Sequence, residues 1–555
     1  MTSRTMRTAI AVATAVALAV SGCGGDDGDE EPGGDNGGKK GGTLVFGTSA
    51  DPVVLDGAYV SDGESLRAIR QIFETLVTTK LGGTDIEPEL ATEFSADEAG
   101  TAWTFKLRED VKFHDGTDFD AEAVCFNFNR WYNFSGIQAS ESVAYYWVTV
   151  FGGFAKNEDP TVKSLYKSCE AKGDNEAVIN LTSPSSSFLA GLALPSFSIA
   201  SPKALAEFGA DKVSGTGDAP KFEGTFGTEH PIGTGPFKLE SFTPKDKLVL
   251  VRNESYWGKK AILDKVIFKP IADGPARRQA LEAGDIQGYD FVDPGDADAL
   301  KGAGFQILER PAFNVGYVGF NQAKPPMDNP KIRQAIAHAL NREALVKAKY
   351  PAGSEVATQF MPPELFGYAG DVTKYDYNVD KAKALIAESG VKNPTLEFFY
   401  PTDVSRPYMP DPAANFQAFK ADLEAAGFKI TPKSVPWRPD YNTNVSAGNG
   451  GHIRLLGWTG DFGDPDNFVG TFFRTKSKSW GFDNAEIFKL LEDGRIETDQ
   501  EKRTEIYKNA NRKIMEFLPG VPYVHTKPAL AFAKGVQGYR TSPVSLEPFA
   551  LVSLG

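Results

Sequence analysis

Segments with strand patterning and segments with helical patterning alternate along most of the chain, and this alternation limits the possible folds more than any single motif. The strand-like segments are Thr43–Gly47, Trp103–Arg108, Val111–Phe113, Val178–Leu181, Lys247–Arg252, Phe313–Phe320, Thr395–Tyr400, Ile453–Leu456 and Val521–Val524. The segments with helical spacing are Ser65–Thr78, Ala121–Trp131, Pro202–Phe208, Pro275–Ala283, Pro330–Val346, Ala414–Ala426, Asn484–Glu492 and Gln500–Phe517. Such alternation predicts an α/β fold and disfavours an all-β or all-helical one.

The first 22 residues have the pattern of an export signal. Arg4 and Arg7 precede an apolar run, Thr8–Val20, that is shorter than the roughly 18 residues of a membrane span. Cys23 follows small residues at the cleavage point, which resembles a bacterial lipobox and implies a lipidated amino terminus. Gly24–Gly42 contains no aliphatic or aromatic side chain. We therefore predict a signal peptide over 1–22, and a lipidated cysteine with a flexible tether over 23–42.

The cysteine count fits an exported protein. Of three cysteines, lipid takes Cys23 and leaves Cys125 and Cys169. Because the compartment outside the cell membrane is oxidising, this pair is a candidate disulfide; two separate buried thiols are the alternative. The sequence has no C-x-x-C motif and its five histidines are scattered, so it predicts no metal site.

Length and charge narrow the class of protein. About 510 of the 555 residues remain after the first 42, which is enough chain for about three domains. The formal net charge is −14, and loss of the two positive charges of Arg4 and Arg7 makes it −16. This balance disfavours nucleic acid or an anionic membrane as a partner and suits a solute with a positive group.

The most unusual loop, Gly457–Phe468, combines glycines, a tryptophan and three carboxylates after an apolar strand. A carboxylate beside an aromatic wall suits an ammonium group, which gains charge attraction and a π face together. An exposed acidic turn is the simpler interpretation. A calcium loop on Asp461, Asp464 and Asp466 is disfavoured because the EF-hand spacing and its bidentate glutamate are missing.

Four segments together resemble extracellular solute-binding proteins of family 5, which serve ABC-type importers of peptides. They are Trp103–Trp131 (WTFKLREDVKFHDGTDFDAEAVCFNFNRW), Pro231–Phe242 with Tyr256-Trp257-Gly258, Phe313–Val346, and Gly457–Phe468. The segments occur in the family's order, and the resemblance covers the chain from Thr43 to its end.

The resemblance implies a two-lobed, periplasmic-binding-protein-like clamp of the cluster C type, with an extra subdomain in the first lobe. The implied boundaries are 43–85, 206–310 and 522–555 for lobe I, 86–205 for the extra subdomain and 311–521 for lobe II. The chain would cross between the lobes near Pro311 and Pro522, and these two crossings would form a hinge with the ligand held between the lobes.

The resemblance also implies site residues. In the dipeptide-binding branch, a carboxylate in a W-T-G-D segment holds the peptide's α-ammonium, and Asp461 stands at that position, after Trp458, Thr459 and Gly460. Arg406, in an R-P-Y segment, is similar to the residue that holds the peptide's carboxylate; an exposed salt-bridge residue is the alternative. Trp458 could line a side-chain pocket or pack in the core. Asp464 and Asp466 are expected to form turns or caps.

The expected function is the capture of short peptides, most simply dipeptides, for an importer. The chain has no Walker motif, so permease and ATPase would be separate subunits, and it would act as a monomer held to the cell membrane by the lipid on Cys23. Opines, oligosaccharides, haem or a nickel complex are alternative solutes, and a peptide-sensing receptor is an alternative role. A secreted hydrolase is disfavoured because H-E-x-x-H and G-x-S-x-G motifs are missing, so no catalytic residue or cofactor is predicted.

Overall fold

The computed structural model describes residues 41–157, 159–217, 219–544 and 547–555. The predicted signal peptide, Cys23 and all but the last two residues of the predicted tether lie outside these ranges. Within them, no helix is both long enough and apolar enough to span a membrane.

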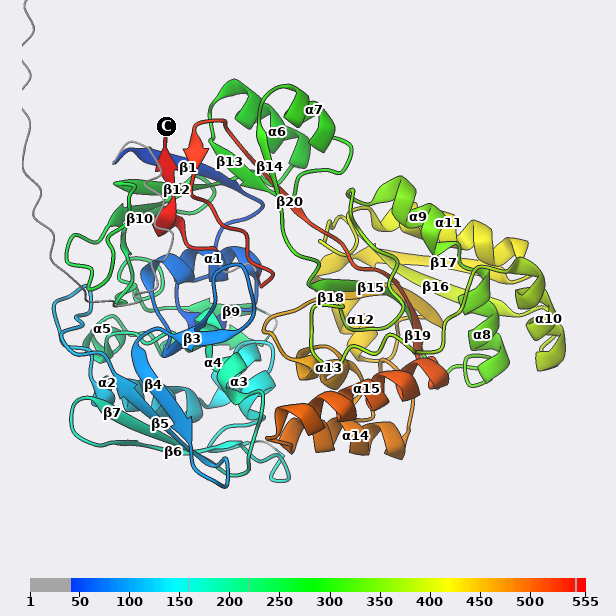
Figure 1. The fold of residues 1–555 in the computed structure, drawn as a ribbon, viewed down its shortest axis with the longest axis horizontal. Coiled ribbons are helices and arrows are strands. Elements are labelled where there is room, and N and C mark those ends of the chain that lie inside the picture. Colours follow the sequence, from blue (N-terminus) through cyan, green and yellow to red (C-terminus); the bar gives the residue numbers. More distant parts are fainter. Residues whose placement is uncertain (1–40, 158, 218, 545–546) are drawn as a thin grey trace, which may run out of the picture. The chain divides into compact units, whose positions relative to one another are not determined.

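Lobe I is built on a mixed seven-stranded sheet (Figure 1). Its strand order is β10 (Phe237–Thr243), β11 (Lys247–Arg252), β12 (Lys265–Pro270), β1 (Thr43–Thr48), β13 (Gly288–Asp290), β20 (Ala529–Phe532) and β14 (Gln306–Glu309). The lobe also contains α1 (Gly63–Ile72), α5 (Pro202–Glu207), α6 (Gly274–Ala283) and α7 (Ala297–Gly302), with the strand pairs β2 (Val77–Thr79)–β3 (Ile86–Pro88), β8 (Val213–Thr216)–β9 (Ala219–Phe222) and β21 (Val536–Gln537)–β22 (Ser553–Leu554). Strand β1 is parallel to β12 and β13, as expected when helices connect neighbouring strands.

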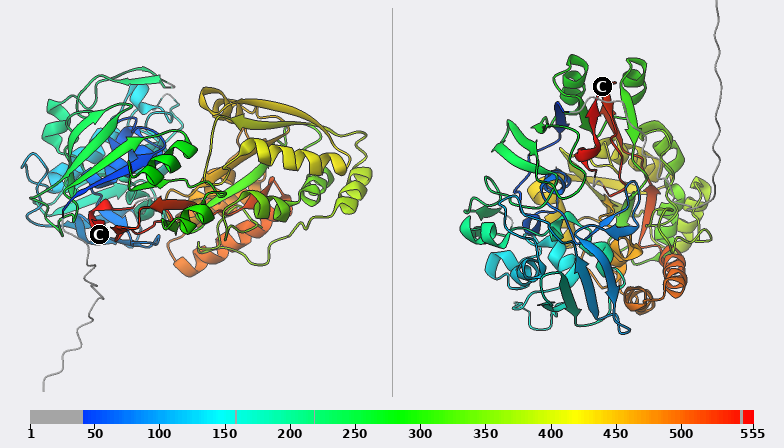
Figure 2. Two further views of the ribbon diagram at one scale, coloured as in Figure 1. Left: turned by 90° about the horizontal axis from the view of Figure 1, so that it is seen from above. Right: turned by 60° about the vertical axis from the view of Figure 1, so that its left-hand side comes forward.

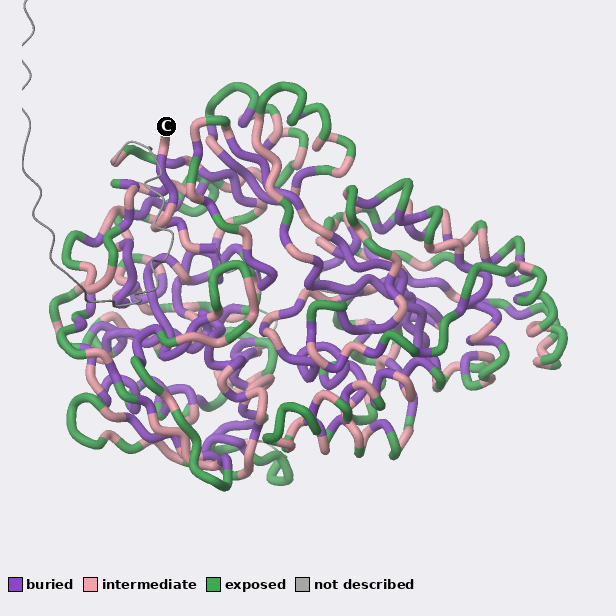
Figure 3. The backbone as a smooth tube through the Cα atoms, viewed as in Figure 1, coloured by how far each residue is buried: buried purple, intermediate pink, exposed green. Residues whose placement is uncertain are grey.

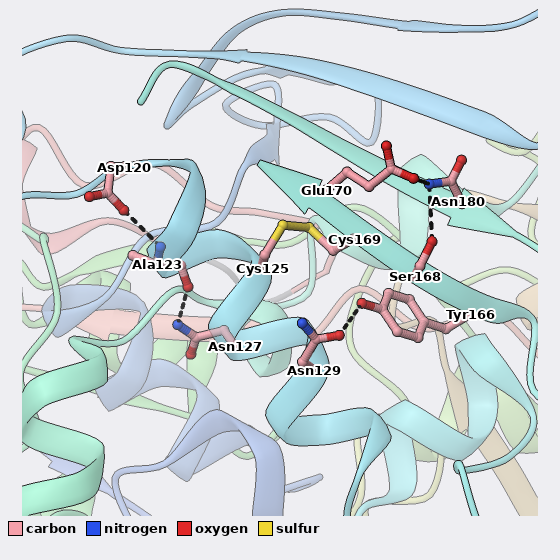
Figure 4. Close-up of a disulfide and its surroundings, with 10 residues drawn as sticks. All are labelled: Asp120, Ala123, Cys125, Asn127, Asn129, Tyr166, Ser168, Cys169, Glu170 and Asn180. Atoms are coloured by element: carbon pink, nitrogen blue, oxygen red, sulfur yellow. Dashed lines mark hydrogen bonds between the residues drawn. A yellow bond between two sulfur atoms is a disulfide. The ribbon is translucent and has the colours of Figure 1, made fainter. Parts of the chain in front are cut away.

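An extra subdomain extends lobe I and is built on a four-stranded antiparallel sheet. Its strands are β4 (Ala91–Ala96), β5 (Ala102–Leu107), β7 (Glu176–Leu181) and β6 (Tyr166–Ala171), and its helices are α2 (Ala121–Tyr132), α3 (Tyr145–Phe151) and α4 (Phe188–Leu192). The Asp120 carboxylate accepts a hydrogen bond from the Ala123 amide and caps α2, as its position before the helical pattern predicts. A disulfide joins Cys125 on α2 to Cys169 on β6 (Figure 4).

Lobe II contains a five-stranded sheet in the order β17 (Lys429–Pro436), β16 (Thr395–Thr402), β18 (Ile453–Thr459), β15 (Asn314–Phe320) and β19 (Gly520–Val524). Its helices are α8 (Pro330–Ala339), α9 (Arg342–Lys349), α10 (Val379–Ser389), α11 (Pro412–Ala425), α12 (Asn442–Ser446), α13 (Val469–Phe473), α14 (Ala485–Ile496) and α15 (Gln500–Phe517). Strand β15 is buried along its whole length and lies inside the sheet, antiparallel to both β18 and β19.

Two segments connect the lobes (Figure 2). The first, 310–313, lies between β14 of lobe I and β15 of lobe II, near the predicted Pro311. The second is 525–528, between β19 and β20. The boundary expected at Pro522 is therefore wrong by a few residues, because Pro522 pairs with Tyr317 inside the lobe II sheet.

Each lobe has its own hydrophobic core, and buried segments run through the centre of both (Figure 3). One predicted helix is divided within lobe II. The segment Pro330–Val346 breaks at Leu340, whose backbone is extended, and Asn341 then caps α9 by accepting from the Ala344 amide. Helical periodicity continues across this break, so the pattern alone did not reveal it.

Candidate functional site

The candidate site begins where strand β18 ends. The Gly460 amide donates a hydrogen bond to the Phe313 carbonyl at 2.8 Å, which ties the start of the loop to the first connecting segment. A β-carbon on Gly460 would lie 2.2 Å from the Phe313 ring, so only glycine allows this close approach. The loop Gly460–Asn467 then turns away from the sheet of lobe II.

Asp461 lies where this loop meets lobe I. One carboxylate oxygen accepts a hydrogen bond from the Tyr146 hydroxyl at 2.8 Å, and Tyr146 belongs to α3 of the extra subdomain. The other oxygen accepts from the Asn467 side-chain amide at 3.1 Å. The Asn467 side-chain oxygen in turn accepts from the Asp461 amide at 2.8 Å. Residues from both lobes thus fix this carboxylate.

No cation of the described part of the chain balances the charge of Asp461. Burial raises the pKa of its carboxyl group to about 6, and the hydrogen bonds from Asn467 and Tyr146 oppose the increase only in part. Burial raises the pKa of the Tyr146 hydroxyl, and the negative charge of Asp461 adds to the increase. Asp461 is half-buried, and a partly desolvated carboxylate without a cationic partner carries a free-energy cost that a positive group would offset.

The other two carboxylates of the loop do have cationic partners. Asp464 accepts two hydrogen bonds from the Arg503 guanidinium, at 2.6 and 2.8 Å, and its side chain also accepts from the Asp466 amide. Asp466 pairs with Arg474 at 2.6 Å. Both acids therefore stabilise the loop. Within the described residues, no group of three or more His, Cys, Asp or Glu side chains could hold a metal ion.

Arg406 follows strand β16, which runs parallel to β18. Because the ends of adjacent parallel strands lie at one edge of a sheet, Arg406 and Asp461 are at the same edge of lobe II. The guanidinium lies over the Trp437 ring at 4.6 Å, and its buried Nε has no hydrogen-bond partner in the described structure. No contact joins it to Asp461 within the described residues.

The residues before Asp461 line the same edge. Trp458 is half-buried, donates from its indole nitrogen to the Asn467 side chain at 3.3 Å and packs edge-on against Phe472. Thr459, also half-buried, pairs with Asn314 at the end of the β15–β18 ladder. Trp458 packs against the lobe II core, as one of its two predicted roles requires. Its exposed surface is available for the other predicted role, lining a side-chain pocket.

Three residues that contribute to the site were not predicted. Asn467 lies within the loop. Its side-chain amide can both donate and accept hydrogen bonds, and this property could have marked it as a partner of Asp461. Tyr146 lies 315 residues from Asp461, and no local pattern connects the two. Phe462 carries an ordinary apolar side chain, yet it packs into the lobe I core.

The lobes also meet away from Asp461. The Arg495 carbonyl at the end of α14 accepts hydrogen bonds from the Ser186 amide at 3.1 Å and the Ser186 hydroxyl at 2.8 Å. A pocket of about 390 Å³ lies beside this contact, between the extra subdomain and lobe II. Its walls include Thr149, Ser164 and Ser185 on one side and Arg474 and Glu492 on the other.

Comparison with known proteins agrees with this architecture. Residues 85–480 match the model of the bacterial extracellular solute-binding proteins, family 5 (middle region). The dipeptide-binding protein of Escherichia coli strain K12 is 30% identical over 525 residues, covering 92% of this chain and 94% of that protein. Heme-binding protein A of Haemophilus influenzae is 31% identical over 524 residues, covering 92% of each.

Solved structures show the same two-lobed fold. The ABC transporter-associated periplasmic binding protein DppA from Helicobacter pylori, in complex with the peptide STSA, superposes with a TM-score of 0.77 at 27% identity. The superposition covers 93% of this chain and 98% of that one. HbpA2 from Haemophilus parasuis gives a TM-score of 0.75 at 29% identity, with 93% and 100% covered.

Proposed function

Because this chain belongs to the bacterial extracellular solute-binding proteins of family 5, we propose that it is the substrate-binding component of an ABC import system and captures short peptides. The observation that carries the proposal is the half-buried Asp461 carboxylate, which lies between the lobes without a cationic partner among the described residues. A peptide's α-ammonium group supplies the missing positive charge. Relatives named for dipeptide binding, and a related structure solved with a bound peptide, support this choice of ligand.

Arg406 is proposed to hold the other end of the peptide. It lies at the same sheet edge as Asp461 and carries no carboxylate partner in the described structure, while Trp437 supports its guanidinium from one face. Two opposite charges at a fixed separation select a zwitterion of matching length. A longer peptide would leave one buried charge unpaired, and this penalty disfavours it. Dipeptides are therefore the expected ligands.

Pairing of the peptide's two terminal charges with Asp461 and Arg406 selects peptides by length more than it raises affinity. A unit pair at ~4 Å contributes roughly 4 kcal/mol at an effective dielectric of ~20, and desolvation costs several kcal/mol per ion. Affinity for different sequences then comes from the peptide backbone, which can hydrogen-bond along Thr459 and Gly460 as an added strand does. Trp458 is proposed to form a wall for the first side chain. A bound peptide contacts both lobes and so favours their closed arrangement.

The partners and the location follow from the same role. The permease and the ATPase are proposed to be separate subunits, and the protein is proposed to act as a monomer, with no catalytic step. Its anchor is proposed to be lipid on Cys23. Replacement Cys23→Ser should release the protein from the membrane fraction into the soluble exported fraction; continued membrane association would exclude the anchor.

The proposal is tested by calorimetric titration with alanyl-alanine, its N-acetyl and C-amide derivatives, and tri- and tetra-alanine. We expect the free dipeptide to bind, N-acetylation to abolish binding and Asp461→Asn to weaken it about 100-fold or more. Asp483→Asn is the matched control, because it removes one negative charge from an exposed lobe II ion pair with Lys476. Equal binding of the acetylated and free peptides would exclude the assigned role of Asp461. Mass spectrometry of the recovered peptide should show it intact, and cleavage products would exclude a pure binding function.

Haem is the second candidate solute, because a heme-binding relative is as similar as the dipeptide-binding one. The same samples separate the two proposals. Titration with haem should produce no saturable change in its absorbance if peptides are the cargo. A saturable spectral change that a dipeptide does not reverse would favour haem.

A further inference from the structure

Three consecutive residues of the Gly460–Asn467 loop touch lobe I. Asp461 accepts from Tyr146 of the extra subdomain. Phe462 is part of the lobe I core and only 5% exposed. Gly463 lies against Thr84, in the loop between β2 and β3; a β-carbon on Gly463 would lie 2.4 Å from the Thr84 β-carbon and 2.9 Å from its carbonyl oxygen. We call Asp461–Gly463 the docking segment.

The three contacts differ in what they require. The contact of Asp461 involves charge, and an ammonium ligand can change it. Those of Phe462 and Gly463 involve only apolar burial and close backbone approach, so they form whenever the lobes meet, with or without ligand. A buried phenylalanine contributes more free energy than a single hydrogen bond. Phe462 therefore has the largest ligand-independent effect among these three contacts.

We propose that Phe462 is a positioning residue: by inserting into the lobe I core it places Asp461 beside Tyr146 and sets the balance between open and closed lobes before any ligand binds. Its neighbour Asp461 then adds the ligand-dependent part. Phe462 thus favours closure through apolar burial, and Asp461 favours it through its charge when a ligand is bound. This inference rests on the proposed function only for its ligand measurements.

The consequence for affinity follows from population arithmetic. When only a fraction of molecules is closed, the apparent dissociation constant equals the intrinsic one divided by that fraction. Loss of Phe462 lowers the closed fraction and leaves the intrinsic constant alone. All peptides should then lose affinity by one common factor, whatever their sequence, and the preference among them should stay the same.

The first experiment needs no ligand. Small-angle X-ray scattering of the ligand-free exported chain should give a larger radius of gyration for Phe462→Ala than for the parent protein. We expect the closed-to-open ratio to fall about 100-fold, the usual scale for removal of a buried phenylalanine. Phe482→Ala is the matched control, because Phe482 is equally well buried but packs within lobe II against Phe473 and Phe488. It should lower the melting temperature and leave the radius of gyration unchanged.

A second variant guards against misfolding of the first. Gly463→Ala removes no core side chain but introduces a methyl group that overlaps Thr84 across the lobe boundary. It should open the lobes as Phe462→Ala does. Adding Thr84→Gly to the same chain should restore closure only in part, because the backbone carbonyl oxygen of residue 84 would still lie close to the new methyl group. An unchanged radius of gyration in both Phe462→Ala and Gly463→Ala would overturn the proposal.

The ligand measurements complete the test. Alanyl-alanine and a second dipeptide should bind Phe462→Ala more weakly by the same factor. A loss confined to one of them would overturn the positioning role and make Phe462 a specificity residue. If the parent protein binds no peptide at all, the proposed function fails, while the scattering comparison still decides the role of Phe462.

Discussion

Asp461 and Asp464 lie three residues apart in one loop, but their carboxylates accept hydrogen bonds from different kinds of group. Asp464 belongs to the half that is anchored within lobe II, where Arg503 supplies two hydrogen bonds from a side chain that is itself buried. Asp461 belongs to the half that faces lobe I, where it receives hydrogen bonds from neutral groups only. Asp464 is buried and Asp461 half-buried. A built-in counter-charge indicates a structural role, and its absence at a partly desolvated carboxylate indicates a place for an external cation.

The largest effect we expect is on stability, at Asp464. Asp464→Asn leaves the Arg503 guanidinium buried without its partner and should lower the free energy of unfolding by about 3–5 kcal/mol, measured by urea denaturation. Asp461→Asn removes a half-buried charge that has no cationic partner among the described residues, and should change that free energy by less than about 1 kcal/mol. A comparable loss in both variants would mean that Asp461 is also structural.

The next effect is on pH dependence. With the lobes in contact at Tyr146, burial raises the pKa of the Asp461 carboxyl from its ordinary 3.8 to about 6. The folded state therefore holds this proton more tightly than the unfolded state does, and the resulting stability is present below about pH 4 and lost as the pH rises to about 6. An ammonium ligand needs the ionised form, so affinity should fall about tenfold per pH unit from pH 6 down to pH 4.

Calorimetric titration across this range measures the effect. The midpoint also reports which ligand-free state predominates, since an open, hydrated Asp461 would keep a pKa near its ordinary value and show the loss only below about pH 4. Asp461→Asn should remove the pH dependence in either case. Because even an open Asp461 should lose affinity below about pH 4, a parent profile that stays flat from pH 7 down to about pH 3 would contradict the assignment of Asp461.

The smallest effect we expect is at Tyr146, which marks the boundary between the two lobes. Tyr146→Phe removes one hydrogen bond to Asp461 and should weaken peptide binding about 3- to 10-fold. Because that hydrogen bond lowers the pKa of the Asp461 carboxyl, its loss should also move the midpoint of the pH profile upward. A weaker affinity with an unmoved midpoint would indicate that Tyr146 acts on closure rather than on the carboxylate.

Sequence patterns predicted the ends of helices and strands correctly where capping residues and apolar spacing determine those ends. Helix Gln500–Phe517 has the predicted ends because Asp499 caps its first turn and its apolar spacing is regular. Strand Lys247–Arg252 likewise has the predicted bounds. The break at Leu340 and the boundary misplaced at Pro522 depend on how the surrounding sheet and helices pack, which periodicity does not report.

In the candidate site too, the features set by nearby residues were predictable and the contacts between distant segments were not. The family resemblance identified Asp461 as a candidate and left Asp464 and Asp466 as turn or cap residues. Asp464 does cap the next turn by accepting from the Asp466 amide, whereas Asp466 forms an ion pair with Arg474. Their guanidinium partners could not be foreseen, because Arg503 is 39 residues from Asp464 in sequence. Tyr146 and the insertion of Phe462 belong to the meeting of two lobes. Contacts of this kind arise only once the whole chain is folded.

The disulfide has a practical consequence for the laboratory. Cys125 and Cys169 are 44 residues apart, and α3, which carries Tyr146, lies between them. A cross-link around a loop of that length contributes about 4 kcal/mol by restricting the unfolded chain. Recombinant protein made in a reducing cytoplasm would lack this cross-link around Tyr146, the tyrosine that donates a hydrogen bond to Asp461. Preparations for affinity work should therefore be secreted or oxidatively refolded, and their free-thiol content checked before any weak binding is interpreted.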